Sequence, residues 1–219
     1  MFRVESMRII IMGPPGSGKG TRAHILSDLY DIPVITTGDL LREAMREETM
    51  YGKIAKNYIE KGDLVPDVIV NEIMKEKMSK IDVKDGFILD GYPRSKAQAE
   101  ALDKILKEIG IEITHVLHVK LSDEIIINRL SKRRSCPKCG AVYHLESAPP
   151  KKDCICDVCG THLIQRDDDK PEVIKHRLEI YREITRPVLE RYKKRGLVVE
   201  TSGKVPIKDI RDQMMELFN

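Results

Sequence analysis

A glycine-rich stretch near the start of the chain has the residue types needed to hold a polyphosphate. It reads GPPGSGKGT over residues 13–21, here called the phosphate loop. Glycines let backbone N–H groups turn toward phosphate oxygens, and a lysine side chain reaches the outer phosphates. An apolar run precedes the loop and a helical pattern follows it, as phosphate binding requires. The predicted phosphate-binding residues are Gly16, Ser17, Gly18, Lys19, Gly20 and Thr21.

Two features of the sequence bear on magnesium. Gly20 follows the lysine, where such loops usually have a serine or threonine whose hydroxyl coordinates Mg²⁺. Thr21 or water must therefore take that role. Asp90 ends an expected buried strand, FILD, at the edge where open parallel sheets gather ligands. A carboxylate there can hold the Mg²⁺ shell through water, so we predict a Mg²⁺ site beside the phosphate loop.

Arginines are the next candidates, because phosphoryl transfer needs positioned positive charge more than a general base. Arginines at expected strand ends and at the edges of irregular segments are Arg42, Arg94, Arg129, Arg133, Arg166 and Arg177. Arg129 and Arg133 are four residues apart in one expected helix, so they should share a face. Each arginine alone is typical of a solvated surface, but their placement favours convergence on one cleft.

Five cysteines lie within residues 136–159, and the chain has no others. The spacing C-x₂-C, sixteen residues, C-x₂-C is typical of a zinc ribbon with ligands Cys136, Cys139, Cys156 and Cys159. Cys154 is left over. Disulfides would need an oxidising compartment, which nothing in the sequence indicates. Four thiolates leave no open coordination position, so the predicted Zn²⁺ is structural and cross-links a segment too small to bury its own core.

Short apolar runs alternate with helical patterns along the chain, which predicts an α/β fold with a five-stranded parallel sheet and helices on both faces. The expected strands are residues 8–12, 33–37, 86–90, 115–121 and 197–201. The expected helices are 19–30, 39–47, 52–61, 67–80, 96–109, 123–134, 171–195 and 207–217. Pro187 predicts a kink in the penultimate helix.

Two segments interrupt the β–α alternation and are expected to be insertions on one core. The core comprises residues 1–36, 66–131 and 170–219. Residues 37–65 form a helical insertion, and residues 132–169, here called the lid, carry the cysteines. A formal net charge of +3 gives no global field for nucleic acid or a membrane surface. The apolar run IIIM is far too short for a leader or a membrane span, so we expect a cytoplasmic protein.

Seven motifs, in order along the chain, together resemble the adenylate kinases of the long-lid type, within the nucleoside-monophosphate kinases. They are GPPGSGKGT (13–21), TTGDLLR (36–42), KGDLVPD (61–67), LDGYPRSKAQA (89–99), NRLSKRR (128–134), QRDDDKPEVIKHRLEIY (165–181) and SGKVP (202–206). The resemblance implies a P-loop kinase fold, an insertion that binds the monophosphate, and a zinc-containing lid.

The resemblance also implies roles for individual residues. ATP would contact the phosphate loop with Arg129, Arg133, Val142, Tyr143 and Val205. AMP would contact Thr37, Arg42, Asp63, Leu64, Val65, Gly91, Tyr92, Pro93, Arg94, Gln98, Arg166 and Arg177. The catalytic set would be Lys19, Asp90, Arg94, Arg129, Arg133, Arg166 and Arg177, while Asp168 and Asp169 would couple the lid to the core.

These residues predict a monomer that transfers the γ-phosphate of ATP to AMP with Mg²⁺, giving two ADP. The lid would carry arginines onto ATP and exclude water on closing. A kinase for another monophosphate, UMP or CMP, is an alternative, because base choice rests on few contacts. A nucleotide-gated zinc ribbon acting on nucleic acid is a further alternative. It would have no need of TTGDLLR or DGYPR, and the lid lacks a basic surface with interleaved aromatics.

Overall fold

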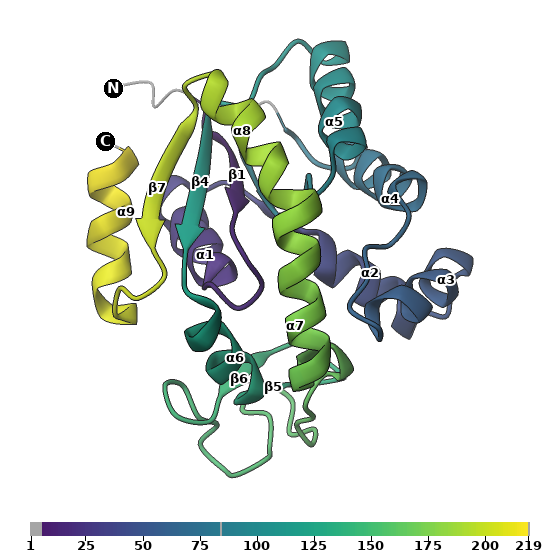
Figure 1. Cartoon of the computed structure of the whole chain (residues 1–219), viewed down its shortest axis with the longest axis vertical. Helices are drawn as coiled ribbons and strands as arrows, with labels where there is room; N and C mark the ends of the chain where they lie inside the picture. The colour runs from purple at the N-terminus through teal and green to yellow at the C-terminus, as the bar shows by residue number, and fades with distance from the viewer. Residues whose placement is uncertain (1–5, 84, 219) are drawn as a thin grey trace.

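The computed structural model describes residues 6–83 and 85–218. Residues 1–5, 84 and 219, which fall in the three predicted core segments, lie outside the described residues. A five-stranded sheet in the order β2-β3-β1-β4-β7 lies at the centre, with every strand pair parallel (Figure 1). Its strands are β1 (Arg8–Met12), β2 (Val34–Thr36), β3 (Phe87–Asp90), β4 (His115–Lys120) and β7 (Val198–Ser202). The predicted sheet is confirmed, and each strand end lies within one residue of its predicted position.

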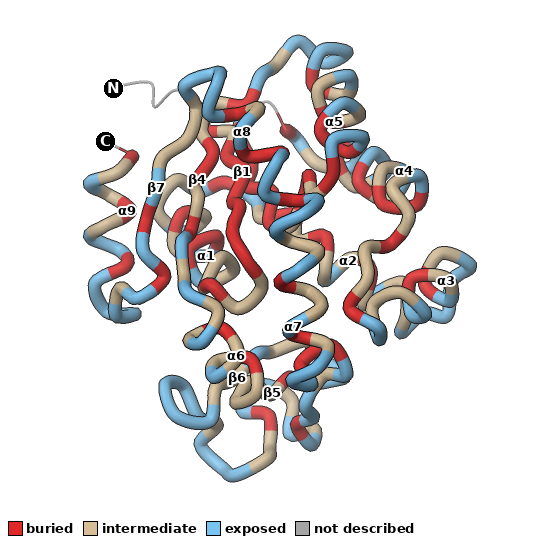
Figure 2. Tube along the Cα trace, viewed as in Figure 1, coloured by how far each residue is buried: buried red, intermediate tan, exposed pale blue. Residues whose placement is uncertain are grey.

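Consecutive side chains of a strand point to opposite faces of the sheet. In the central strands β1 and β3 both sets are mainly apolar, and helices cover them on each face. Ile10 packs in one hydrophobic cluster with helices α4 (Asp67–Ser79), α5 (Lys96–Glu108) and α8 (Arg186–Lys194). Its neighbours Ile9 and Ile11 pack in another with α1 (Lys19–Tyr30) and α9 (Ile210–Phe218). Figure 2 shows β1 buried along its length. The inner residues of β1 and β3 are therefore apolar, and the polar residues of these two strands, Arg8 and Asp90, lie at strand ends.

The main helices follow the predicted order, with differences at a few ends. They are α1 (Lys19–Tyr30), α2 (Thr37–Arg46), α3 (Met50–Ile59), α4 (Asp67–Ser79), α5 (Lys96–Glu108), α6 (Asp123–Ser131), α7 (Pro171–Ile180), α8 (Arg186–Lys194) and α9 (Ile210–Phe218). A 3₁₀ turn, η3 (Ile207–Asp209), precedes α9 where the sequence predicted helix from residue 207. No helix among the described residues combines the length and apolar character needed to cross a membrane.

The prediction that Arg129 and Arg133 share one helix face is wrong. Helix α6 ends at Ser131, and Arg133 begins a strand, β5 (Arg133–Ser135). This strand pairs antiparallel with β6 (Val142–His144). Pairing within the lid supplies hydrogen bonds that a further helical turn would otherwise provide, so the chain leaves the helix two residues before Arg133.

The long helix near the C-terminus changes its winding where the kink was predicted. A π-helical turn, η2 (Tyr181–Thr185), joins α7 to α8, and the N–H of Arg186 donates to the carbonyl of Tyr181, five residues back. Pro187 has no N–H to donate, and its ring would clash with the carbonyl four residues earlier. A wider turn accommodates both restrictions.

Two parts of the chain project from the sheet (Figure 1). Helices α2 and α3 pack closely on one side, where a Cβ at buried Gly52 would collide with the carbonyl oxygen of Ala44. The residues around β5 and β6 form the other projection. The two projections lie within the predicted insertions, whose exact boundaries stay a prediction.

Candidate active site

A cleft of about 1110 Å³ lies at the carboxyl ends of the sheet strands. The predicted site residues that line it are Gly16, Gly18, Lys19, Gly20, Thr21, Arg42, Leu64, Asp90, Gly91, Pro93, Arg94, Arg129, Arg133, Val142, Tyr143, Arg166, Arg177 and Val205. They come from the phosphate loop, the turn after β3, helices α2, α6 and α7, the lid and the segment after β7. Parts of the chain far apart in sequence therefore form one cavity.

The phosphate loop owes its shape to its glycines. Gly16 and Gly18 have positive φ angles of 72° and 91°, in the left-handed region that favours glycine. A Cβ at Gly16 would lie 2.7 Å from the side chain of Leu130, so the loop also packs tightly against α6. Lys19 lies inside this loop, where its Nζ donates to the carbonyls of Gly13 at 2.9 Å and Pro14 at 2.8 Å.

Lys19 and Asp90 form the charged floor of the cleft. Burial lowers the pKa of Lys19 to about 8, an effect that the carboxylate of Asp90 opposes. Burial likewise raises the pKa of Asp90, against the attraction of Lys19 and Arg94. A Cβ at Gly20 would lie 3.6 Å from Oδ2 of Asp90, so the lysine's neighbour adjoins this carboxylate. Together with Thr21, these oxygens are the hard ligands and outer-shell partners that suit Mg²⁺.

Arg133 and Arg177 are anchored by two buried carboxylates in the 3₁₀ turn η1 (Asp167–Asp169). Nε and an amino group of Arg133 donate to the two oxygens of Asp169, at 2.8 and 2.6 Å. Arg177 lies 3.0 Å from a carboxylate oxygen of Asp168. Burial alone would raise the pKa of Asp168, but nearby arginines lower it overall. A lid strand and helix α7 are thus tied to the same acidic turn.

Two further arginines, Arg42 and Arg94, face the cleft without a buried carboxylate partner. Arg42 pairs with Asp39 at 2.7 Å, and a Cβ on Gly38 would press against its guanidinium. Nε of Arg94 donates to the carbonyl of Gly91 at 2.8 Å. Burial lowers the pKa of Arg94, and neighbouring Arg177 adds to the effect. Guanidinium groups keep their charge at neutral pH, so the cleft concentrates cations suited to phosphates.

A second cavity of about 70 Å³ adjoins the cleft beside α2 and α4. The predicted site residues that line it are Thr37, Arg42, Asp63, Leu64, Val65, Gly91, Arg94, Gln98 and Arg177. The side chain of Gln98 is fixed at both ends. Its Nε2 donates to Asp67 at 2.8 Å, and its Oε1 accepts from the backbone N–H of Arg94 at 2.7 Å.

The structure does not bring every predicted side chain to these cavities. Tyr92 is buried in the core, where its hydroxyl donates to Asn71 at 2.9 Å, so its ring lines neither cavity. Ser17 is also buried and lines neither. Tyr143 lines the cleft, but its hydroxyl accepts from the N–H of Asp157 at 2.8 Å and contacts Cys156 at 3.5 Å. Part of its role is therefore to brace the lid.

The four predicted cysteine ligands form one cluster in the lid. Their sulfur atoms all lie within 4.8 Å of one another, with Cys136 3.4 Å from Cys159 and Cys139 3.5 Å from Cys156. A tetrahedral Zn²⁺ with bonds of about 2.3 Å separates its sulfurs by about 3.8 Å, so the donor set fits. Cys154 lies outside the cluster, and its thiol donates to Asp153.

Arg22 is a residue of the cleft that was not predicted from the sequence. Its buried guanidinium donates to the carbonyls of Ser202 at 2.7 Å and Gly18 at 3.3 Å, and it lines the cleft. It joins the phosphate loop to the end of β7. The only sequence signal is its position three residues after Lys19, on the same side of α1.

Comparisons with known proteins agree with this geometry. The family model described as "Adenylate kinase" matches residues 11–197. An adenylate kinase of Caldicellulosiruptor bescii is 51% identical over 210 residues, which cover 96% of this chain and 98% of that protein. One from Archaeoglobus fulgidus is 48% identical over 204 residues, covering 93% of this chain and 94% of that protein. The phosphate loop, the arginine-lined cleft and these matches show that the chain belongs to the adenylate kinase family.

Proposed function

We propose that the protein transfers the γ-phosphate of ATP to AMP, giving two ADP, with Mg²⁺ as the metal. One observation carries this proposal: the cleft of the phosphate loop and the smaller cavity share a wall that contains Arg42, Arg94 and Arg177. Two nucleotides bound on either side would direct their phosphates at the same cations. Membership of the adenylate kinase family supports the same reaction.

The chemistry needs no side-chain nucleophile. An oxygen of the AMP phosphate attacks the γ-phosphorus in line, while the bond from that phosphorus to the β,γ-bridging oxygen breaks and its electron pair leaves with ADP. Lys19 and the phosphate-loop amides hold the β- and γ-phosphates. The negative charge of the phosphoryl group during transfer is stabilised by Arg94, Arg129, Arg133, Arg166 and Arg177. Asp90 and Thr21 would hold Mg²⁺, directly or through water, and the ion would supply positive charge that offsets the phosphate charge.

Binding of the two nucleosides divides between the cavities. Thr37, Gln98 and the backbone at 63–65 would hold the AMP nucleoside in the smaller cavity, where Gln98 is held in one orientation by Asp67 and Arg94. Val142, Tyr143 and Val205 would contact the ATP adenosine at the open end of the cleft. A fixed amide lets the site distinguish bases by their hydrogen-bonding edges.

Residues 132–169 would carry a structural Zn²⁺ on Cys136, Cys139, Cys156 and Cys159, which folds the segment without taking part in catalysis. Residues 37–65 would form the AMP-binding insertion, and residues 1–36, 66–131 and 170–219 the core. We further propose a cytoplasmic monomer, since one chain supplies both cavities and thiolate ligands persist in a reducing compartment.

Steady-state ADP formation from ATP with AMP, GMP, CMP or UMP tests the proposal. We expect kcat/KM with AMP to exceed that with each other monophosphate by about tenfold or more, because Gln98 is held in one orientation. Higher turnover with UMP or CMP would reassign the second substrate. No ADP with any monophosphate would refute the reaction.

Lys19 gives the reaction an alkaline limit. Its ammonium is charged below a pKa of about 8 and neutral above it, so it loses its attraction for phosphate as the pH rises through that value. We expect kcat/KM for ATP to fall about tenfold per pH unit above the pKa. The kcat should fall only at a higher pH than kcat/KM does, because bound phosphates stabilise the charged form of Lys19. A Lys19→Arg variant, though less active, should not show this fall in kcat/KM at high pH. A wild-type kcat/KM that stays constant up to about pH 9.5 would contradict the role of Lys19.

A further inference from the structure

Strand β5 ends at Ser135, a buried serine in the lid. Its backbone pairs with Ile164 in both directions, at 2.8 and 2.9 Å. Arg166 follows Ile164 by two residues with extended backbone, so it lies on the same face of its segment as Ile164. Ser135, directly opposite Ile164, is therefore a diagonal neighbour of Arg166.

Their side chains meet across this pair. Nε of Arg166 donates to Oγ of Ser135 at 2.7 Å. Within residues 6–83 and 85–218, the guanidinium of Arg166 makes no other hydrogen bond and no ion pair; only the backbone carbonyl of this residue is engaged as well, by the N–H of Asp169 at 3.1 Å. Arg133 and Arg177, in contrast, are paired with Asp169 and Asp168. The serine therefore holds the inner nitrogen of the guanidinium while both terminal amino groups keep their donors for another ligand.

The surroundings of Arg166 make this restraint important. Burial lowers the pKa of Arg166 to about 9, and the nearby cations Arg42 and Arg133 push in the same direction, against the weaker opposing effect of the Asp168 and Asp169 carboxylates. A long side chain among like charges is driven toward solvent. A carboxylate would hold it, but would also cancel the charge that a phosphate needs. A neutral hydroxyl restrains the side chain and leaves its full charge directed at the cleft.

We infer that Ser135 is a positioning residue that aims Arg166 at the phosphates in the cleft. The inference rests on the proposed function, in which Arg166 contacts the phosphoryl group in flight. Ser135 itself does not line the cleft and touches no substrate. Its effect should therefore appear in kcat, through the orientation of Arg166, more than in the KM of either nucleotide.

Removing the hydroxyl tests this inference. We expect Ser135→Ala and Ser135→Val to lower kcat about tenfold, as for loss of a hydrogen bond to a charged group, with KM values changed less than about twofold. Ser135→Thr, which keeps the hydroxyl, should retain most of the wild-type kcat. Ser131→Ala is the matched control, because that nearby hydroxyl donates only to the carbonyl of Asn128. Wild-type kcat in Ser135→Ala would overturn the inference.

A double-mutant cycle separates positioning from general support of the lid. Arg166→Met alone should lower kcat about a hundredfold, and adding Ser135→Ala should lower it less than about twofold further. An equal fall in both backgrounds would show that Ser135 only stabilises the lid and would overturn the inference. Unchanged kcat in Arg166→Met would instead refute the proposed role of Arg166. Metal content per chain and thermal unfolding of each variant complete the test.

Discussion

Replacing Arg94 with alanine should lower kcat about a hundredfold. Arg94 lines both cavities, so its guanidinium faces the place where the two sets of phosphates meet. Removal of one charged contact to a transition state in a water-poor site costs about 3 kcal/mol. The carbonyl of Gly91 holds Nε of Arg94, so the amino groups are already oriented. Steady-state ADP formation at saturating ATP and AMP measures the loss.

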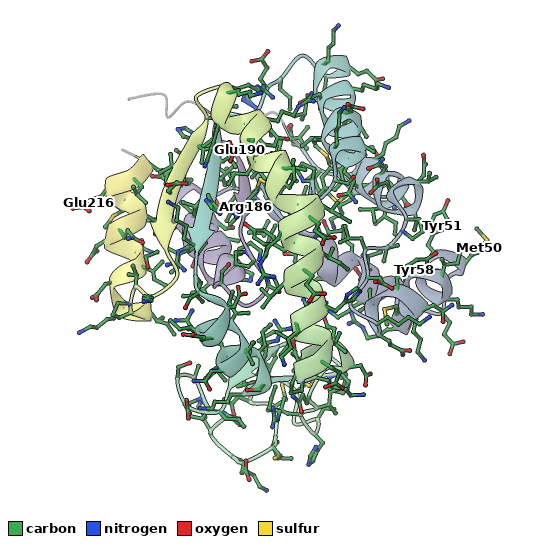
Figure 3. All side chains as sticks on the ribbon, in the orientation of Figure 1. Met50, Tyr51, Tyr58, Arg186, Glu190 and Glu216 are labelled. Carbon is green, nitrogen blue, oxygen red and sulfur yellow. The ribbon has the colours of Figure 1, made fainter. Side chains whose placement is uncertain are left out.

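The matched control for Arg94→Ala is Arg186→Ala. Arg186, labelled on α8 in Figure 3, is exposed and lines neither cavity. Arg186→Ala removes the same side chain and changes the net charge by the same amount as Arg94→Ala. Because Arg186 is an ordinary surface residue, the kcat of this variant should stay within about twofold of wild type. Circular dichroism and thermal unfolding confirm the fold of both variants. Equal kcat in the two variants would remove Arg94 from the catalytic set.

Removal of the Zn²⁺ proposed for the lid should lower ADP formation about tenfold or more while AMP still binds. A metal-dependent segment loses its folding free energy with its metal, so the lid would hold Arg133 and Arg166 over the cleft in only a fraction of molecules. Of the lid, only Asp168 lines the smaller cavity, and it lies outside the cysteine-bearing residues 136–159. Chelation, or Cys136→Ser with Cys139→Ser, followed by AMP calorimetry and activity assays, measures both effects.

Cys154→Ser is the matched control for metal loss. Cys154 lies in the same segment but outside the sulfur cluster, so this variant should keep one metal per chain and full turnover. Cys156→Ser should lose metal. Reversed behaviour of these two variants would show that the ligand assignment is wrong. Full turnover by metal-free protein would confine the metal to thermal stability, and loss of AMP binding as well would show that the lid does not fold independently of the AMP site.

The sequence predicted those features that depend on local pattern. The sheet strands were found because burial on both faces requires uninterrupted apolar runs such as RIIIM. The phosphate loop was found because its glycines and lysine sit between a strand and a helix. The cysteine cluster was found because of its spacing, and the sulfurs of Cys136 and Cys159 lie close together as that spacing predicts.

Features that depend on contacts between distant parts of the chain could not be predicted from local sequence patterns. Arg133 and Arg134 are good helix formers, so nothing local ends α6 at Ser131; strand pairing with β6 decides it. The bond from Arg22 to Ser202 joins residues 180 positions apart. The contact of Ser135 with Arg166 depends on the register of the lid segments. Tyr92 was misplaced because its motif neighbours line the cavities while its own ring enters the core.

The π-helical turn between α7 and α8 sets how far the cleft-facing side of α7 is rotated, about the helix axis, from the core-facing side of α8. On α7, Arg177 faces the cleft, whereas Tyr192 on α8 packs in the core cluster. Each residue of an α-helix rotates the chain by about 100°. The extra residue of the wide turn therefore offsets one face from the other by about that angle. A single deletion within Tyr181–Thr185 would remove this offset, so with α8 held in the core it would swing Arg177 away from the phosphates.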